Sequence, residues 1–189
     1  MEPPQRLELV VDHEITLRQF APCDAPTIFS VIDRNRDWLS QHGDITASKY
    51  PTEESVYESI INPPNPLRLR FGIITAGALV GTVNLTLDSD QSLLYKRAEI
   101  GAWVGKEYSR KGYCRRSING LVKYGFETLG LDEIWALVNK ENQESISMIT
   151  QAGFSVQEER STPEEWYFFK LGADFNFENS SHFEEGKGR

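Results

Sequence analysis

A cluster of basic residues interrupts an otherwise acidic chain. Positions 106–116 carry five Lys or Arg residues and one acid, Glu107, whereas the 189-residue chain has a net charge of −8. The cluster follows an apolar run at 97–104 and precedes the clearest helical pattern in the sequence. A helix start presents unpaired N–H groups and the positive end of the helix dipole, so cations are unfavourable there unless an anion binds. This order of residues predicts a phosphate-binding loop.

Gly112 lies within this loop, just before the helix is expected to begin. A side chain there would obstruct a ligand that approaches the backbone, and glycine has none. Backbone N–H groups from Lys111 to Cys114 would then face a diphosphate, while Arg and Lys side chains neutralise its charge. The alternative is a solvated, basic helix start. The residues assigned to phosphate binding are Ser109, Arg110, Lys111, Gly112, Tyr113, Cys114 and Arg115.

Glu99 is the second chemical candidate, because it interrupts an apolar strand. A partly buried carboxylate has a raised pKa and can act as a general base near neutral pH. The alternatives are a structural carboxylate paired with an arginine such as Arg97 or Arg116, or a side chain directed to solvent. Neither cysteine is a convincing nucleophile: basic neighbours could lower the pKa of Cys114, but it has no evident His base.

The elements that position these residues follow from apolar periodicity. Ile118, Leu121, Val122 and Phe126 define one face of a long helix. Asp24, Thr52 and Asn142 are expected to cap other helices. Strands are expected at 15–20, 68–74, 79–87, 97–104, 134–138, 154–160 and 166–171.

The order of these elements predicts an α/β (α+β) fold. The 97–138 segment is a strand-helix-strand unit, so its two strands should be parallel, whereas 68–87 should be a hairpin around Ala76 and Gly77. We therefore expect a mixed, mostly antiparallel seven-stranded sheet with a central parallel pair and helices on both faces.

Length and composition place this fold in one domain, residues 1–172, followed by a polar tail, 173–189, expected to be disordered. Two distant cysteines and no signal or membrane pattern predict a cytoplasmic protein. Its oligomeric state, monomer or homodimer, is left open by the sequence. Isolated histidines predict no metal site. The acidic balance argues against direct nucleic-acid binding and slightly favours cationic substrates.

The sequence resembles the general amine N-acetyltransferase (GNAT) superfamily, which uses acetyl-coenzyme A. It is most similar to the RimJ/RimL-like branch, which acetylates the N-termini of ribosomal proteins. Four segments carry the resemblance: Glu99–Val104, Ser109–Cys114, Asn142-x-x-Ser145 with Gly153-Phe154, and Asn35–Leu39.

The resemblance implies an acyl-CoA N-acyltransferase fold and acetyl-CoA as the acetyl donor. It adds Trp103, Val104, Asn142 and Ser145 to the cofactor contacts, with the Val104 N–H stabilising the developing oxyanion. Many members have a tyrosine acid where this chain has Ile149, so Ser145 becomes the candidate proton donor beside the base Glu99. Ser109 and Cys114 also depart from the usual phosphate-loop residues, and Ser109 could weaken one phosphate contact.

The expected reaction is direct transfer of an acetyl group to a primary amine. A protein N-terminal α-amine, as in ribosomal proteins, is the easiest acceptor because its pKa is only about 7.7–8.0. The alternatives are a small amine, such as an aminoglycoside or polyamine, and a non-catalytic CoA-binding module. Glu164 and Glu165 are either a second carboxylate pair facing the amine or two solvated acids.

Overall fold

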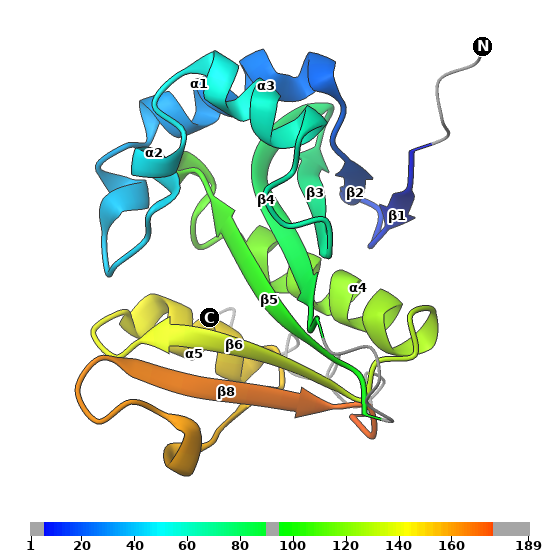
Figure 1. Ribbon diagram of the computed structural model, residues 1–189, viewed down its shortest axis with the longest axis vertical. Helices are drawn as coiled ribbons and strands as arrows, with labels where there is room; N and C mark the ends of the chain where they lie inside the picture. The colour runs from blue at the N-terminus through cyan, green and yellow to red at the C-terminus, as the bar shows by residue number, and fades with distance from the viewer. Residues whose placement is uncertain (1–5, 90–94, 176–189) are drawn as a thin grey trace, which may run out of the picture.

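In the computed structural model, which describes residues 6–89 and 95–175, eight strands form one mixed sheet. The order is β1-β2-β3-β4-β5-β6-β8-β7, with all neighbours antiparallel except the parallel pair β5 and β6 (Figure 1). This confirms the predicted mixed sheet with its central parallel pair. The strands are β1 Glu8–Val10, β2 Ile15–Gln19, β3 Arg68–Thr75, β4 Ala78–Leu87, β5 Arg97–Val104, β6 Glu133–Asn139, β7 Ser155–Val156 and β8 Trp166–Gly172.

The sheet has eight strands rather than seven because the beginning of the chain adds an edge strand. Residues Glu8–Val10, where no strand was expected, pair with residues 16–18 in the middle of β2. At the opposite edge the predicted strand 154–160 is shorter, since only Ser155 and Val156 pair with β8. The chain then forms a 3-10 helix at Glu158–Arg160, where every residue is charged and none favours a strand.

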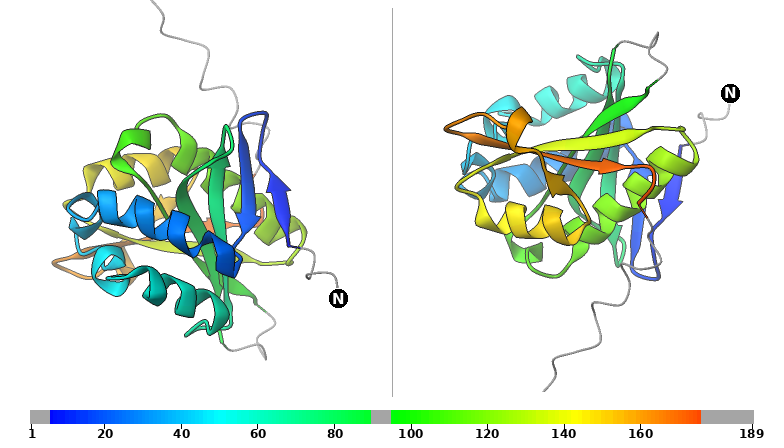
Figure 2. Two further views of the ribbon diagram at one scale, coloured as in Figure 1. Left: turned by 90° about the horizontal axis from the view of Figure 1, so that it is seen from above. Right: turned by 90° about the horizontal axis from the view of Figure 1, so that it is seen from below.

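Helices cover both faces of the sheet, as predicted. Apolar residues of α1–α3 bury one face, and those of α4 and α5 bury the other, as the two views of Figure 2 show. The predicted apolar face of α4 is confirmed, because Ile118, Leu121 and Val122 are buried in the core. The helices are α1 Ala25–Arg34, α2 Thr46–Lys49, α3 Glu53–Ile61, α4 Tyr113–Glu127 and α5 Gln143–Gln151.

Two of the three predicted helix caps form. The Thr52 hydroxyl accepts the N–H of Ser55 at 3.1 Å, and the Asn142 amide oxygen accepts the N–H of Ser145 at 3.0 Å. Asp24 precedes α1 but its carboxylate accepts from the Ala21 N–H, at 2.7 Å, instead of from the helix. The short helix α2 was not predicted, because four residues are too few to show a period.

The parallel pair separates along its length. β5 pairs with β4 over Gly81–Leu87, but with β6 only over its first three residues, Arg97–Glu99. Beyond that point the carboxyl ends of β5 and β6 diverge (Figure 1). We call this opening the β5–β6 split. It leaves one side of β5 without a strand partner in the middle of the sheet.

Two further features of the chain bear on the predictions. No helix among residues 6–89 and 95–175 is long and apolar enough to cross a membrane. The predicted polar tail begins at residue 173, and its residues 176–189 lie outside the part of the chain that the structure describes.

Candidate active site

The β5–β6 split leaves the backbone of β5 at Val104 without a partner on β6. The N–H of Gly105 donates to Val80 of β4 at 2.9 Å, so the alternation of an antiparallel ladder directs the Val104 N–H away from β4 and into the split. The Val104 carbonyl accepts the indole N–H of Trp38 at 3.1 Å. The predicted donor at Val104 therefore has the required direction, and a tryptophan fixes the strand end beside it.

The predicted phosphate loop ends in a helix start that no side chain caps. Gly112 is the N-cap of α4 and has φ of 76°, a left-handed conformation that L-residues adopt at a cost. The N–H groups of Tyr113 and Cys114 have no partner within the helix. A Cβ built at Gly112 would meet only Arg116 Nε, at 3.9 Å. Conformation therefore favours glycine here, and the space in front of it is open.

Two of the basic side chains of the loop are committed to other contacts. Arg116, a member of the basic cluster, donates to Asp12 at 2.9 Å and to Glu14 at 2.8 Å, so it anchors the β1–β2 turn. Arg110 forms an ion pair with Glu144 in the first turn of α5. That pair joins the phosphate loop to α5.

The remaining loop residues differ in what they can offer a ligand. Both donors of Ser109, its N–H at 3.1 Å and its hydroxyl at 2.8 Å, point to the Lys106 carbonyl. The ammonium of Lys111 is exposed and lies over the Tyr108 ring. Burial against the core raises the pKa of the Cys114 thiol to about 12. The expected lowering of that pKa is wrong, so Cys114 is a thiol at neutral pH.

Glu99 is half-buried on the face of β5 that α1–α3 cover. Burial raises its pKa above the ordinary value, and the nearby Arg68 guanidinium partly opposes the shift. Arg97 and Arg116, the arginines named in the structural alternative, pair instead with Asp88 at 2.7 Å and with the β1–β2 turn. Glu99 thus has the burial and the pKa direction that a general base requires.

Asn142 and Ser145 lie where β6 leads into α5, at the open end of the split. Asn142 caps α5, as predicted, and its contact with the cofactor stays a prediction. Ser145 is half-buried, and its role as a proton donor stays a prediction. Glu164 and Glu165 are exposed in the loop before β8, where the Glu165 carbonyl accepts the Lys140 N–H at 2.9 Å. Their position favours the interpretation as solvated acids.

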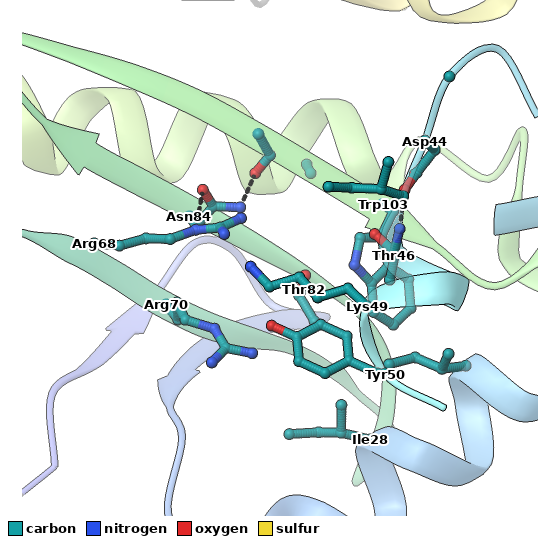
Figure 3. Close-up of a pocket in the computed structure, with 15 residues that line it drawn as sticks. Ile28, Asp44, Thr46, Lys49, Tyr50, Arg68, Arg70, Thr82, Asn84 and Trp103 are labelled. Carbon is teal, nitrogen blue, oxygen red and sulfur yellow. Dashed lines mark hydrogen bonds between the residues drawn. The ribbon is translucent and has the colours of Figure 1, made fainter. Parts of the chain in front are cut away.

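A cavity of about 330 Å³ lies between the sheet and helices α1 and α2. Trp103 lines it, so the side chain of this predicted cofactor residue faces α1–α3 and not α4. Three basic residues, Lys49, Arg68 and Arg70, also line the cavity (Figure 3), against one acid, Asp44. Sequence reasoning missed this lining. Arg68 and Arg70 alternate within one strand, which was the available signal that they share a face.

Asn35 is a further residue that the sequence did not identify individually. Its buried side chain accepts the Lys106 N–H at 2.8 Å and donates to the Val31 carbonyl at 2.9 Å. It therefore ties the end of α1 to the turn that follows β5. The segment Asn35–Leu39, singled out by resemblance, holds the strand end at Val104 through both Asn35 and Trp38.

Comparison with known proteins assigns the family. Residues 14–155 match the model of the acetyltransferase (GNAT) domain, and the chain belongs to this family of acyltransferases. YdaF of Bacillus subtilis, whose provisional name is ribosomal N-acetyltransferase, is 27% identical over 150 residues, 76% of this chain and 79% of YdaF. Spermidine N(1)-acetyltransferase of Escherichia coli is 32% identical over 90 residues, 48% of this chain and 47% of that enzyme.

The fold has a solved counterpart. A structure of RimL, the ribosomal L7/L12 alpha-N-protein acetyltransferase, in complex with coenzyme A superimposes with a TM-score of 0.75 at 13% identity. The match covers 88% of this chain and 98% of that chain. The expected acyl-CoA N-acyltransferase fold is thereby confirmed.

Proposed function

We propose that this protein transfers the acetyl group of acetyl-CoA directly to the α-amine of a protein N-terminus. The observation that carries the proposal is the β5–β6 split, which leaves the Val104 N–H without a strand partner at the end of β5 that leads to the uncapped start of α4. YdaF and RimL, whose names refer to ribosomal acetylation, support a protein acceptor.

The residues at the start of α4 fit a diphosphate. The N–H groups of Tyr113 and Cys114 lack helical partners, the left-handed Gly112 leaves open space in front of them, and Lys111 is exposed nearby. The first turn of α4 contains no acid and contains Arg115, an arrangement that an anion stabilises. Acetyl-CoA, when bound, supplies an activated acetyl group. Trp103, Val104, Asn142 and Ser145 are its further proposed contacts.

Three groups of the chain then act on the reacting atoms. Glu99 accepts the proton that the attacking amine loses, directly or through water. The Val104 N–H donates a hydrogen bond to the carbonyl oxygen as that oxygen gains negative charge. Ser145 donates a proton to the departing thiolate. An α-amine needs little help from the base, because its pKa of about 7.7–8.0 lies close to neutrality.

Similarity to one relative supports the polyamine alternative, whereas the positive charge of the cavity argues against it. Spermidine N(1)-acetyltransferase matches half of this chain. However, a polyamine is a multiple cation, and the cavity beside Trp103 is lined by three cations and one acid. Like charges repel in a cavity of restricted solvent access. This lining also opposes our initial inference that the acidic composition favours cationic substrates.

The experiment is a CoA-release assay with acetyl-CoA and amidated peptides, compared with spermidine. We expect release with peptides, a loss of about 100-fold or more in kcat for Glu99→Gln or Ser145→Ala, and no loss for Glu127→Gln, an exposed change on α4. Binding of CoA without turnover on any amine would instead support the non-catalytic CoA-binding module.

A further inference from the structure

Three basic side chains converge in the cavity between the sheet and helices α1 and α2. Arg68 and Arg70 come from β3, and Lys49 comes from the end of α2. Figure 3 shows the Lys49 side chain reaching over Tyr50 into the space between the two arginines. We call Lys49, Arg68 and Arg70 the basic triad. It lies on the same face of the sheet as Glu99 and Trp103.

Arg70 is the most constrained member of the triad. Its guanidinium donates to the carbonyl and hydroxyl of Ser59 at 3.1 and 3.0 Å and lies over the rings of Phe20 and Tyr50. Burial lowers the pKa of Arg70; Tyr50 opposes this shift, and the charge of Arg68 adds to it. Neutral partners and aromatic rings hold the side chain in place without neutralising it.

The other two members carry no neutralising ion pair either. Arg68 donates to the Asn84 side-chain oxygen at 3.0 Å, and Asn84 in turn donates to the Gly101 carbonyl at 3.0 Å. The Lys49 ammonium lies over the Tyr50 ring. Within residues 6–89 and 95–175, the ion pairs formed by Lys and Arg include none made by a member of the triad.

Asp44 does not compensate for this charge. It is the acid in the cavity lining, and its carboxylate accepts the Thr46 N–H at 2.7 Å. Arg68 and Arg70 are half-buried, and the charge of Glu99 acts on Arg68 without forming an ion pair with it. Removing cations from water without a paired anion is unfavourable, so an anion would stabilise the two arginines. Arginine side chains in addition bind carboxylates with good geometry.

We infer that the basic triad binds a carboxylate of the acceptor, so that the protein prefers peptides with an acidic residue close to the N-terminus. This inference rests on the proposed function and adds a substrate class to it. Arg70 is level with Gly101 across two strand spacings, and Val104 is three residues further along β5. At about 4.8 Å per spacing and about 3.3 Å per residue, the acid falls roughly at the second or third acceptor residue.

The test measures kcat/KM on amidated peptides that share an N-terminal serine and differ at residue three, as Glu, Gln or Lys. We expect Glu to exceed Gln by at least tenfold and Lys to be the poorest. The Glu-to-Gln ratio should fall toward one in Arg70→Met and invert toward Lys in Lys49→Glu. The matched control is Lys123→Gln, an exposed change on α4, which should keep the ratio.

Two further arms remove ambiguity. Lys49 is exposed, so Lys49→Glu decides the question even if Arg70→Met fails to fold. A Ser-Ala dipeptide with a free carboxylate, compared with its amide, distinguishes a terminal carboxylate from an acidic side chain.

Each result has one meaning. Acetylation of Glu, Gln and Lys peptides at equal rates, or a Glu-to-Gln ratio unchanged in both variants, would overturn the inference and leave the proposed function standing. Preference for spermidine over every peptide would overturn the inference and the choice of a protein acceptor. Absence of transfer to every amine would overturn the proposed function itself.

Discussion

Replacement of Gly112 by alanine separates the conformational role of this residue from its role in cofactor binding. Gly112 has φ of 76°, and a Cβ there would meet no atom closer than Arg116 Nε at 3.9 Å. Gly77, in the β3–β4 turn, also has φ of 76°, and a Cβ there would meet nothing within 4 Å. Alanine therefore imposes the same backbone strain at both positions, and only Gly112 adjoins the proposed diphosphate site.

The expected magnitudes follow from these two contributions. A left-handed conformation costs an L-residue about 1–2 kcal/mol. For a chain of this size that corresponds to a fall in melting temperature of about 2–8 °C for each variant. At Gly112 the added methyl group also faces the approaching phosphate. Loss of one hydrogen bond to a charged group, about 1.5–3 kcal/mol, would weaken CoA binding by about 10- to 150-fold.

Thermal unfolding and calorimetric titration with CoA measure the two effects separately. We expect equal destabilisation of Gly112→Ala and Gly77→Ala, with weakened CoA binding in Gly112→Ala alone. If both variants lose stability equally and bind CoA within twofold of each other, the start of α4 does not hold the diphosphate.

Three further predictions concern the base, the loop anchor and the ion pair of the β1–β2 turn. Glu99→Gln should lower kcat/KM at pH 7 by about 100-fold. It should also remove the acidic limb of the pH-rate profile, which reports the raised pKa of Glu99. Because the variant has no half-buried charge at this position, its free energy of unfolding at pH 7 should be no lower than that of the parent protein. Asn35→Ala should cost about 1–3 kcal/mol in urea unfolding because the Lys106 N–H loses its acceptor, whereas exposed Asn62→Ala should cost little. Arg116→Gln should leave CoA affinity unchanged. Burial tends to raise the pKa of Asp12, but backbone hydrogen bonds and Arg116 lower it overall. Ionised Asp12 therefore adds to the free energy of unfolding above pH 3.8, and this contribution is lost on acidification. In Arg116→Gln the loss of stability on acidification should be smaller.

The features predicted from sequence are those that local patterns encode. The face of α4, the Thr52 and Asn142 caps and the β3–β4 hairpin each depend on residues a few positions apart, and all three form. The lone parallel pair followed from the helix that connects its strands. Strand β1 was missed because three residues show no alternation, and its pairing with β2 supplies the stabilisation.

The parts of the site that could not be predicted depend on contacts between distant segments. Arg116 meets Asp12 and Glu14 from more than a hundred residues away, so a basic cluster in sequence became partly an internal anchor. The basic triad combines β3 with α2, an unpredicted helix. The spacing of residues along the chain does not predict such long-range contacts, because they depend on how the elements pack.

A crystal structure of the protein with coenzyme A tests the central claim most directly. We expect the diphosphate against the N–H groups of Tyr113 and Cys114, beside Gly112, with the thiol in the β5–β6 split next to Val104. A diphosphate bound elsewhere, or a split filled by side chains of the protein while the coenzyme is bound, would contradict it.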